Sequence, residues 1–243
     1  MVFDVFQYSN KGGRSYNEDA SGWITDNDVG IFVVADGLGG HALGDLASDT
    51  AVTMLVENIW IDKAEDVSEQ LSNKIGEANR AILKLQEQDS MGQKMKTTVA
   101  ALAVYGDNAV WANVGDSRVY FIHNNKLHSY TDDHSVAYKK YKAGEITREQ
   151  LSTDEDQSRL LRALGNPERC EPSLYSADVL LKAGDAFFLC SDGAWELLKD
   201  EEIVIDYLKA EDARQWAELL LVRMMERVGE GHDNLTLMTV ILQ

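Results

Sequence analysis

Short runs of apolar and β-branched residues alternate along this chain with longer segments in which apolar residues recur every three or four positions. Six runs have the composition of buried strands: residues 31–35, 98–105, 109–114, 118–122, 185–190 and 235–242. Three segments place their apolar residues on one helical face: residues 47–59, 67–85 and 213–224. The pattern predicts several core strands covered by three amphipathic helices.

The connections between these elements are short. The strands between residues 98 and 128 are separated by Gly106-Asp107-Asn108 and by Asn124-Asn125, which favour antiparallel hairpins. The acidic segment 26–30 is predicted to be another hairpin turn and not a calcium loop, because Gly30 stands where a ligand is required. Together the connections predict an α+β fold with helices layered outside a sheet core.

The chain has no Pro- or Ser-rich linker and no repeat, so residues 1–243 are expected to form a single domain. The stretch 134–158 differs from the rest, because it is polar and carries two short helical patterns on either side of Gly144. This stretch is predicted to be an insertion or lid on the surface.

The composition is strongly acidic, with 41 acidic and 23 basic residues and a net charge of −18. Such a chain repels nucleic acids and anionic membranes, so neither is an expected partner. No apolar run approaches the ~20 residues of a membrane span, and the first residues do not resemble a signal peptide, so we expect a cytoplasmic protein. Cys190 ends an apolar run and is followed by Asp192 and Glu196, which favours a buried, inert thiol over a nucleophile.

Acidic residues recur at the ends of the predicted strands. Asp36, Asp116 and Asp192 each follow a strand, and Asp233 directly precedes one. A single aspartate at the end of a strand is common in β-turns. Four of them at the ends of core strands favour a bound cation, because unpaired buried carboxylates are costly. Oxygen ligands without clustered Cys or His favour Mg²⁺ or Mn²⁺ over zinc.

The glycines after Asp36 raise an alternative. Residues 37–42 satisfy a dinucleotide-binding pattern, with Glu57 twenty residues beyond Gly37. However, Glu57 lies inside a predicted helix, and Asp36 would repel a pyrophosphate. The pattern therefore disfavours a dinucleotide site without excluding it.

Eight motifs in order along nearly the whole chain resemble the bacterial branch of the metal-dependent protein phosphatases, the type 2C or PPM family. They are Arg14-x-x-Asn17-Glu18-Asp19, Val34-Ala35-Asp36-Gly37-Leu38-Gly39-Gly40-His41, Thr97-Thr98, Asn113-Val114-Gly115-Asp116-Ser117-Arg118, Asp132-Asp133-His134-Ser135, Leu161-Arg162-Ala163-Leu164-Gly165, Ser191-Asp192-Gly193 and Asp233-Asn234-x-Thr236. The resemblance implies a four-layer sandwich, in which two antiparallel sheets pack face to face with helices outside.

The same resemblance implies the ligands of two metal ions. Asp36 corresponds to the carboxylate that bridges both ions, and the backbone carbonyl of Gly37 to a ligand of one. Asp192 and Asp233 resemble the remaining ligands of the other ion. Asp19 is expected among the metal-binding residues through the water molecules of the second ion.

Further site residues follow from the resemblance. Glu18 and Asn234 are expected in the outer shell of the metal site. Arg14 resembles a bidentate phosphate clamp, and its alternative is a surface salt bridge. Asp116, with Asp192, matches the position of a third metal ion, and its alternative is a β-turn aspartate.

The chain also departs from the animal enzymes of this family. Leu38 stands where those enzymes place a histidine proposed as general acid. His41 is expected to cap or pack at the start of a helix, and His134 is expected to have a structural role more than a catalytic one. The group that protonates the leaving oxygen is therefore unassigned.

The resemblance predicts a serine/threonine phosphoprotein phosphatase that reverses a cognate Ser/Thr kinase and acts as a monomer. A hydroxide bridging two cations would attack the phosphomonoester directly, without a phosphoenzyme. The alternatives are a pseudoenzyme that binds phosphoproteins, and an esterase or nuclease on the same scaffold. In the insertion, the lysines Lys139, Lys140 and Lys142 accompany two tyrosines and are expected to select phosphoprotein substrates, whereas a solvated helix face is the alternative.

Overall fold

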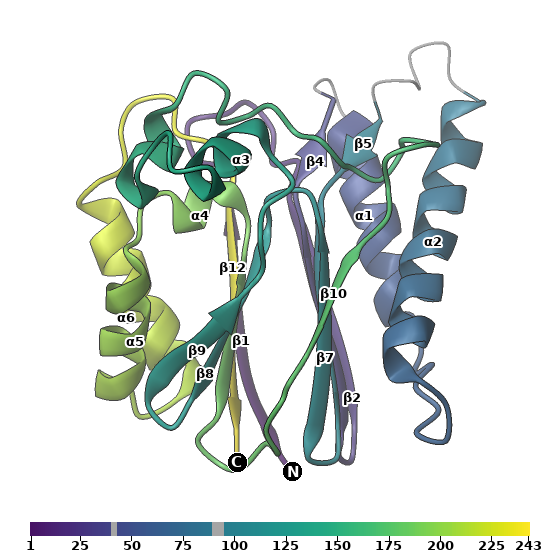
Figure 1. Cartoon of the computed structure of the whole chain (residues 1–243), viewed down its shortest axis with the longest axis vertical. Helices are drawn as coiled ribbons and strands as arrows, with labels where there is room; N and C mark the ends of the chain where they lie inside the picture. Colours follow the sequence, from purple (N-terminus) through teal and green to yellow (C-terminus); the bar gives the residue numbers. More distant parts are fainter. Residues whose placement is uncertain (40–42, 89–94) are drawn as a thin grey trace.

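Two five-stranded antiparallel sheets pack face to face in the computed structural model, which describes residues 1–39, 43–88 and 95–243 (Figure 1). The first sheet has the order β1 (Phe3–Asn10), β12 (Leu235–Leu242), β11 (Ala186–Cys190), β8 (Arg118–His123) and β9 (Lys126–Tyr130). The second has the order β10 (Ser173–Ser176), β7 (Asn108–Val114), β6 (Val99–Tyr105), β3 (Val29–Ala35) and β2 (Ala20–Asp26). A small third sheet pairs β4 (Gly37–Leu38) with β5 (Lys96–Thr97).

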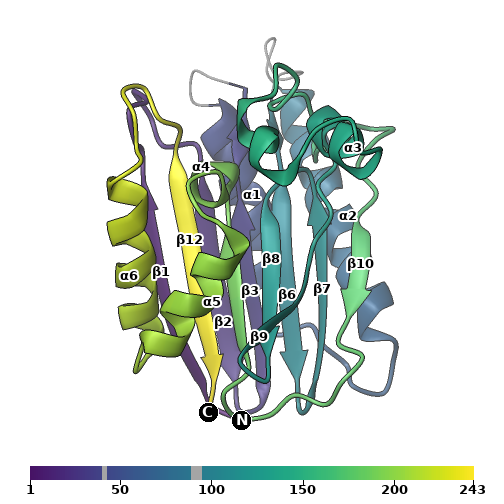
Figure 2. The ribbon, with the colours of Figure 1, turned by 60° about the vertical axis from the view of Figure 1, so that its left-hand side comes forward.

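Helices cover the outer face of each large sheet, as Figures 1 and 2 show. The second sheet is covered by α1 (Leu43–Val56) and α2 (Val67–Gln86). The first is covered by α5 (Asp200–Lys209) and α6 (Ala213–Met225). The predicted four-layer α+β sandwich is therefore confirmed. Within the described ranges, no helix has the length and apolar character needed to cross a bilayer.

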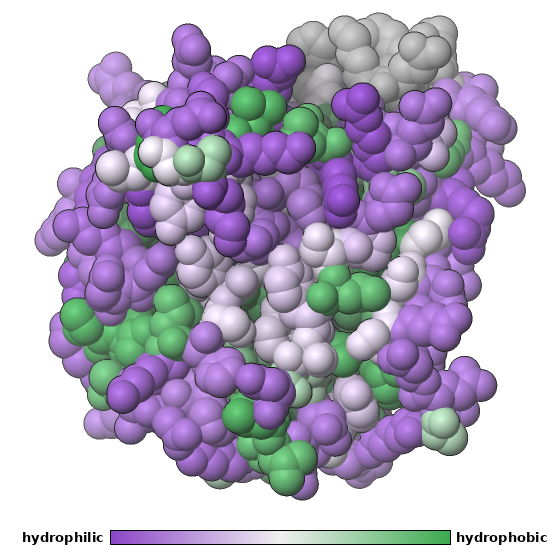
Figure 3. Space-filling model, in the orientation of Figure 1, coloured by the Kyte–Doolittle hydropathy of each residue, from purple (hydrophilic) through white to green (hydrophobic). Residues whose placement is uncertain are grey.

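The layering explains why the central strands read as continuous apolar runs. In β3, Ile31 and Val33 pack under α1 and α2, whereas Phe32 and Val34 point into the space between the two sheets. Both faces of the strand are therefore buried, and an alternation of polar and apolar residues would place polar groups in a core. On the face of the molecule that Figure 3 draws, in contrast, hydrophilic residues predominate.

The predicted hairpins are confirmed. β2 and β3 pair around the two-residue turn at Asn27, and β6 pairs with β7, as β8 does with β9. However, β7 and β8 belong to different sheets, so the turn at Gly115-Asp116-Ser117 carries the chain across the sandwich instead of closing a hairpin. The helix predicted for 47–59 ends at Val56, where the indole of Trp60 donates to the carbonyl of Leu55.

The stretch 134–158 lies over one end of the sandwich and contains α3 (Val136–Lys142) and a 3₁₀ helix, Arg148–Thr153 (Figure 2). The two helical pieces flank Gly144, which adopts a φ of 75°. Two side chains attach the stretch 134–158 to the body of the protein. Leu151 is buried in the core of the first sheet, and the guanidinium of Arg148 donates to Asp200 at 2.8 Å.

Candidate functional site

A cavity of about 490 Å³ opens at the end of the sandwich where the predicted strand-end aspartates meet. Its walls contain Asp36 after β3, Asp116 between β7 and β8, Asp192 at the start of α4 (Asp192–Trp195) and Asp233 before β12. The loop between β1 and β2 adds Arg14 and Glu18, and Gly37, Leu38 and Asn234 also line the cavity. The predicted residue Asp19 is not in the lining, and its Oδ1 is buried. Residues 134–158 contribute Ser158. The structure thus brings together residues from both sheets and from the insertion.

The acids lie close enough to share a cation. One oxygen each from Asp36, Asp116 and Asp192 lies within 4.8 Å of the other two. The amide of Gly193 donates to Asp192 at 2.6 Å, and the amide of Asn234 donates to Asp233 at 2.8 Å. These bonds orient the carboxylates at the mouth of the cavity.

Burial makes this cluster unfavourable for uncompensated negative charge. It raises the pKa of Asp36 and of Asp116 well above the ordinary value, and in both cases repulsion from Asp192 adds to the effect. It also raises the pKa of Asp192 to about 6, with repulsion from Asp233 as the next cause. For Asp19, burial raises the pKa to about 7. A bound cation would relieve this repulsion.

The cluster passes a test of its fit to metal ions. Three buried carboxylate oxygens have no hydrogen-bond partner in the described part of the chain: Glu18 Oε1, Asp19 Oδ1 and Asp116 Oδ1. Buried polar atoms are ordinarily satisfied, so each orphaned oxygen indicates a missing electropositive partner. An all-oxygen set of this kind suits hard divalent cations.

Backbone contacts hold Asp36 in place. The amide of Asp36 donates to the hydroxyl of Thr98 at 2.9 Å, and its carbonyl accepts from the hydroxyl of Thr97 at 2.8 Å. The Thr98 hydroxyl also contacts the hydroxyl of Ser117, next to Asp116, at 2.7 Å. The two threonines therefore join the strand end that carries Asp36 to the turn that carries Asp116. Sequence reasoning gave them no role, although they form one of the quoted motifs.

The turn at Asp116 requires glycine. Gly115 has a φ of 97°, and a Cβ at this position would lie 2.6 Å from the side chain of Thr98. Any other residue would be strained by the backbone and would also push the threonine away. Gly115 thus allows β7 to approach Thr98 closely before the chain turns into Asp116.

Hydrogen bonds hold the loop between β1 and β2 against the residues that precede β12. The side chain of Asn234 donates to the carbonyls of Lys11 and Tyr16 at 2.9 Å each and accepts from the amide of Glu18 at 2.8 Å. The hydroxyl of Ser191 donates to Asp19 Oδ2 at 2.8 Å. Asn234 is therefore the connecting residue of the loop. Ser191, which had no predicted role, orients Asp19.

Arg14 lies at the mouth of the cavity and pairs with Asp233, Nη2 to Oδ2, at 2.8 Å. Both side chains are substantially exposed, so this ion pair contributes little to stability. The contact matches the predicted alternative of a salt bridge, but it lies inside the site and not on a remote surface. Its guanidinium is therefore positioned to meet an anion that enters the cavity.

Behind Asp116 lies a buried group that sequence reasoning also missed. The guanidinium of Arg118 is fully buried, pairs with Asp133 at 2.6 Å and stacks on the indole of Trp195 at 3.5 Å. The indole N–H of Trp195 donates to the carbonyl of Asp116 at 2.9 Å. The buried ion pair and the indole stacked on it therefore link the turn at Asp116 to α4, which begins at Asp192. The Gly-Asp-Ser-Arg motif contained the signal, but its partner Asp133 could not be identified from spacing.

Of the two histidines that were assigned roles from the sequence, the structure describes His134. His41 lies outside the described residues. His134 accepts a hydrogen bond on Nδ1 from the amide of Gly115 at 3.2 Å, and burial lowers its pKa to about 4. The ring is neutral and holds the Gly115 turn, which is a structural role. Cys190 is buried, and burial raises its pKa, as an inert thiol requires.

The lysines of the insertion are not equivalent. Lys140 pairs with Asp154 and Asp156 at 2.8 Å each, and Lys142 pairs with Asp132 at 3.2 Å. The ring of Tyr138 is buried, and its hydroxyl donates to Asp132 at 2.5 Å. Most of the predicted basic and aromatic strip is therefore bound to acids, either within the insertion or at Asp132 just before it. Lys139 is exposed.

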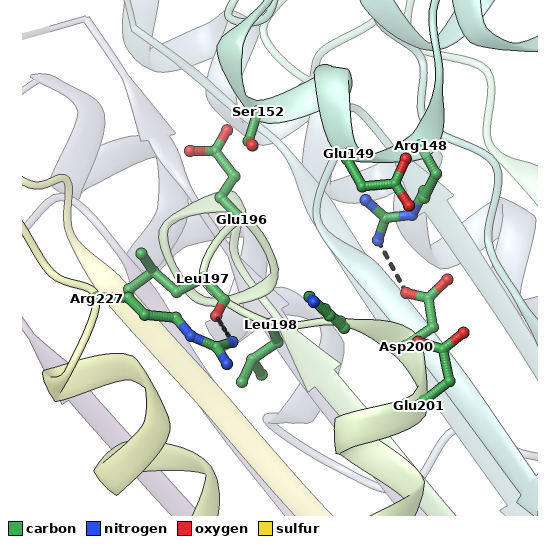
Figure 4. A pocket seen from close by; sticks show the side chains of 10 residues that line it. Arg148, Glu149, Ser152, Glu196, Leu197, Leu198, Asp200, Glu201 and Arg227 are labelled. Atoms are coloured by element: carbon green, nitrogen blue, oxygen red, sulfur yellow. Dashed lines mark hydrogen bonds and ion pairs between the residues drawn. The ribbon is translucent and has the colours of Figure 1, made fainter.

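A second cavity, of about 570 Å³, lies between the 3₁₀ helix of the insertion and the turn from α4 to α5 (Figure 4). In its lining Arg148 donates to Asp200 at 2.8 Å, and Arg227 donates to the carbonyl of Leu197 at 2.7 Å. Glu196 lies at its upper end and accepts from Gln157 of the insertion. This cavity marks where the insertion is anchored and contains none of the predicted metal ligands.

Comparisons with known proteins agree with this geometry. The family model described as protein phosphatase 2C matches residues 7–218. The serine/threonine phosphatase stp of Listeria welshimeri is 34% identical over 233 residues, which cover 93% of this chain and 90% of that protein. The Mycobacterium tuberculosis serine/threonine phosphatase PstP/Ppp superposes with a TM-score of 0.87 at 28% identity, with full coverage of both chains. A structure of the PstP catalytic domain in complex with two manganese ions has a TM-score of 0.84 at 27% identity and covers 100% of this chain and 99% of that one.

Proposed function

Since the chain belongs to the protein phosphatase 2C family and is a serine/threonine protein phosphatase, we propose that the cavity at the end of the sandwich is its active site. The observation that carries this proposal is the cluster of Asp36, Asp116 and Asp192, whose oxygens lie within 4.8 Å of one another. The family depends on metal ions, and the orphaned carboxylate oxygens of this cavity support their binding here.

We propose Mn²⁺ or Mg²⁺ as the cations, two in number and with room for a third. When bound, divalent cations supply the Lewis acidity that activates water for direct attack on the phosphorus without a phosphoenzyme. Asp36 would hold both ions and Gly37 would offer its backbone carbonyl to one. Asp192 and Asp233 would be the remaining ligands of one ion, whereas Asp19 and the outer-shell residue Glu18, both on the β1–β2 loop, would hold the water molecules of the other. Asp116 and Asp192 would hold the third.

The remaining residues of the cavity orient the substrate and the ligands. Arg14 would offer its planar guanidinium to the phosphate oxygens. Asn234 and Ser191 hold the loop that carries Glu18 and Asp19. Leu38 has no proton to donate to the leaving oxygen. Without cations, the negative charge of the carboxylates would repel anions from the cavity, and bound cations together with Arg14 would offset that charge.

We further propose that residues 1–243 act as one phosphatase domain, in which residues 134–158 form a flap beside the active site. Its substrates are phosphoproteins, which a Ser/Thr kinase must generate. We propose that the chain acts as a monomer. Arg148 and Leu151 attach the flap to the body of the protein, and Ser158 at its end lines the cavity.

The test is release of phosphate from a phosphothreonine peptide with Mn²⁺, with Mg²⁺ and with EDTA. We expect turnover only with a cation, and none from Asp192→Asn, which keeps the acceptor for the Gly193 amide but removes the charge. Circular dichroism would verify that the variant is folded. Normal turnover by the folded variant, or turnover in EDTA, would refute the assignment. Binding of phosphopeptide without turnover by the wild type would instead favour a pseudoenzyme.

A further inference from the structure

A separate cleft of about 440 Å³ lies beside the base of the flap. Three basic side chains line it: Lys139 from α3, and Arg162 and Arg169 from the segment that follows the flap. We name it the basic cleft after these three residues. Such a concentration of positive charge is unusual in a chain with a net charge of −18.

The charge of the basic cleft is not cancelled locally. Lys139, Arg162 and Arg169 form no ion pair with any residue in the described ranges, unlike Lys140 on the same helix. Two acids also line the cleft, Asp133 and Glu171. Asp133 is already neutralised by the buried guanidinium of Arg118. The cleft therefore presents three cations against one carboxylate, and its field attracts anions.

His134 leaves Arg162 free to bind a ligand. Because the amide of Gly115 donates to Nδ1 of His134, the ring proton lies on Nε2, which donates to the hydroxyl of Ser173 at 2.8 Å. Arg162 Nη1 lies 3.4 Å from this protonated nitrogen and has no acceptor there. Its partner is the backbone carbonyl of Glu171 at 3.1 Å. Most N–H donors of the Arg162 guanidinium are thus available to an anion.

The basic cleft and the active-site cavity share a thin wall. Leu160 lines the cavity, and the next two residues, Leu161 and Arg162, line the cleft. Likewise Asp116 lines the cavity, while its neighbour Gly115 bonds to His134 in the cleft. An extended peptide advances about 3.3–3.6 Å per residue, so a chain held in the cavity reaches past this wall within a few residues.

We propose that the basic cleft is a substrate subsite that binds a second anionic group, two to four residues from the phosphoresidue being hydrolysed. The group is an acidic side chain or a second phosphate on the same phosphoprotein. Arg162 and Arg169 bind it, and Lys139 adds charge from the flap. The proposal rests on the proposed active site, because it requires hydrolysis in the neighbouring cavity.

The experiment compares kcat/KM for three sets of phosphothreonine peptides. The first set has neutral flanks. In the second set, each peptide carries one glutamate, two to four residues before or after the phosphothreonine. In the third set, a non-hydrolysable phosphonate analogue of phosphoserine takes the place of that glutamate. We expect an anion at the favoured position to raise kcat/KM about tenfold, as charge-assisted hydrogen bonds do. The glutamate and phosphonate sets show which source of the anion is preferred.

The double variant Arg162→Gln/Arg169→Gln should reduce the ratio of anionic to neutral kcat/KM to about one, because each change removes a charge but keeps a polar side chain. Arg162→Lys/Arg169→Lys should retain most of the preference. The control Arg214→Gln/Lys126→Gln removes the same charge far from the cleft and should leave the ratio as in the wild type. Equal kcat/KM for all three sets in the wild type, or an undiminished ratio in the glutamine variant, would overturn the subsite alone. Failure to hydrolyse any peptide would overturn the proposed active site as well.

Discussion

Replacing Asp192 by asparagine should stabilise the metal-free protein while abolishing turnover. Burial and the neighbouring Asp233 raise the pKa of Asp192 from 3.8 to about 6. In the unfolded chain this carboxyl has its ordinary pKa, so the folded state holds the proton more tightly than the unfolded state does. The resulting stability is present below pH 4 and is lost as the pH rises through about 6.

The size of the effect follows from the two pKa values. A rise from 3.8 to about 6 corresponds to about 3 kcal/mol of folding free energy lost above pH 6 in the absence of cations. Asparagine does not titrate, and its side-chain oxygen can still accept from the Gly193 amide. For a chain of this size, about 3 kcal/mol corresponds to a rise in Tm of roughly 6–12 °C at pH 8 as an upper bound.

The assay is thermal unfolding in EDTA at pH 5 and pH 8, repeated with Mn²⁺. We expect Asp192→Asn to have the higher Tm in EDTA at pH 8, a smaller advantage at pH 5 and no such advantage once Mn²⁺ stabilises the wild type. Asp178→Asn, an exposed aspartate outside the cluster, is the control and should not show this pattern. A lower Tm than the wild type in EDTA at pH 8, or the same difference at both pH values, would refute the electrostatic account.

Three further predictions concern single residues. Arg14→Ala should raise KM for a phosphothreonine peptide about tenfold with a smaller change in kcat, because a phosphate clamp acts in both the ground and transition states. If Arg14→Ala had the same kinetics as the control Arg214→Ala, Arg14 would only form a surface salt bridge. Asp133→Asn should lower the free energy of unfolding in urea by about 3–5 kcal/mol, because the guanidinium of Arg118 is left buried without a counter-charge; a change below 1 kcal/mol would show that the buried pair is dispensable. Trp195→Phe should cost about 1–3 kcal/mol in the same assay, since the Asp116 carbonyl loses its indole donor while the aromatic face on Arg118 remains; an unchanged unfolding midpoint would contradict this.

Much of the fold was predictable because local burial leaves a local pattern. The apolar run at 31–35 reports a strand covered on both faces, and the helical period at 67–85 reports one buried side of α2. The edge strand β1 was missed because its residues are only partly buried and so carry a weak pattern. The family motifs supplied the remaining architecture, which periodicity alone left open.

The sequence by itself also determined which residue types stand at the strand ends, and hence that Asp36, Asp116, Asp192 and Asp233 are candidates for one site. Only the tertiary structure decided which of them meet. Asp116 and Asp192 approach each other because β8 pairs with β11 and places Arg118 opposite Cys190, and Asp36 joins them from β3 of the other sheet. The same holds for charge. Composition placed lysines in the flap, but long-range contacts pair Lys140 and Lys142 with acids and leave Lys139 to share a cleft with Arg162 and Arg169. Charge–charge energies depend on distance and burial, and neither is set until the chain has folded.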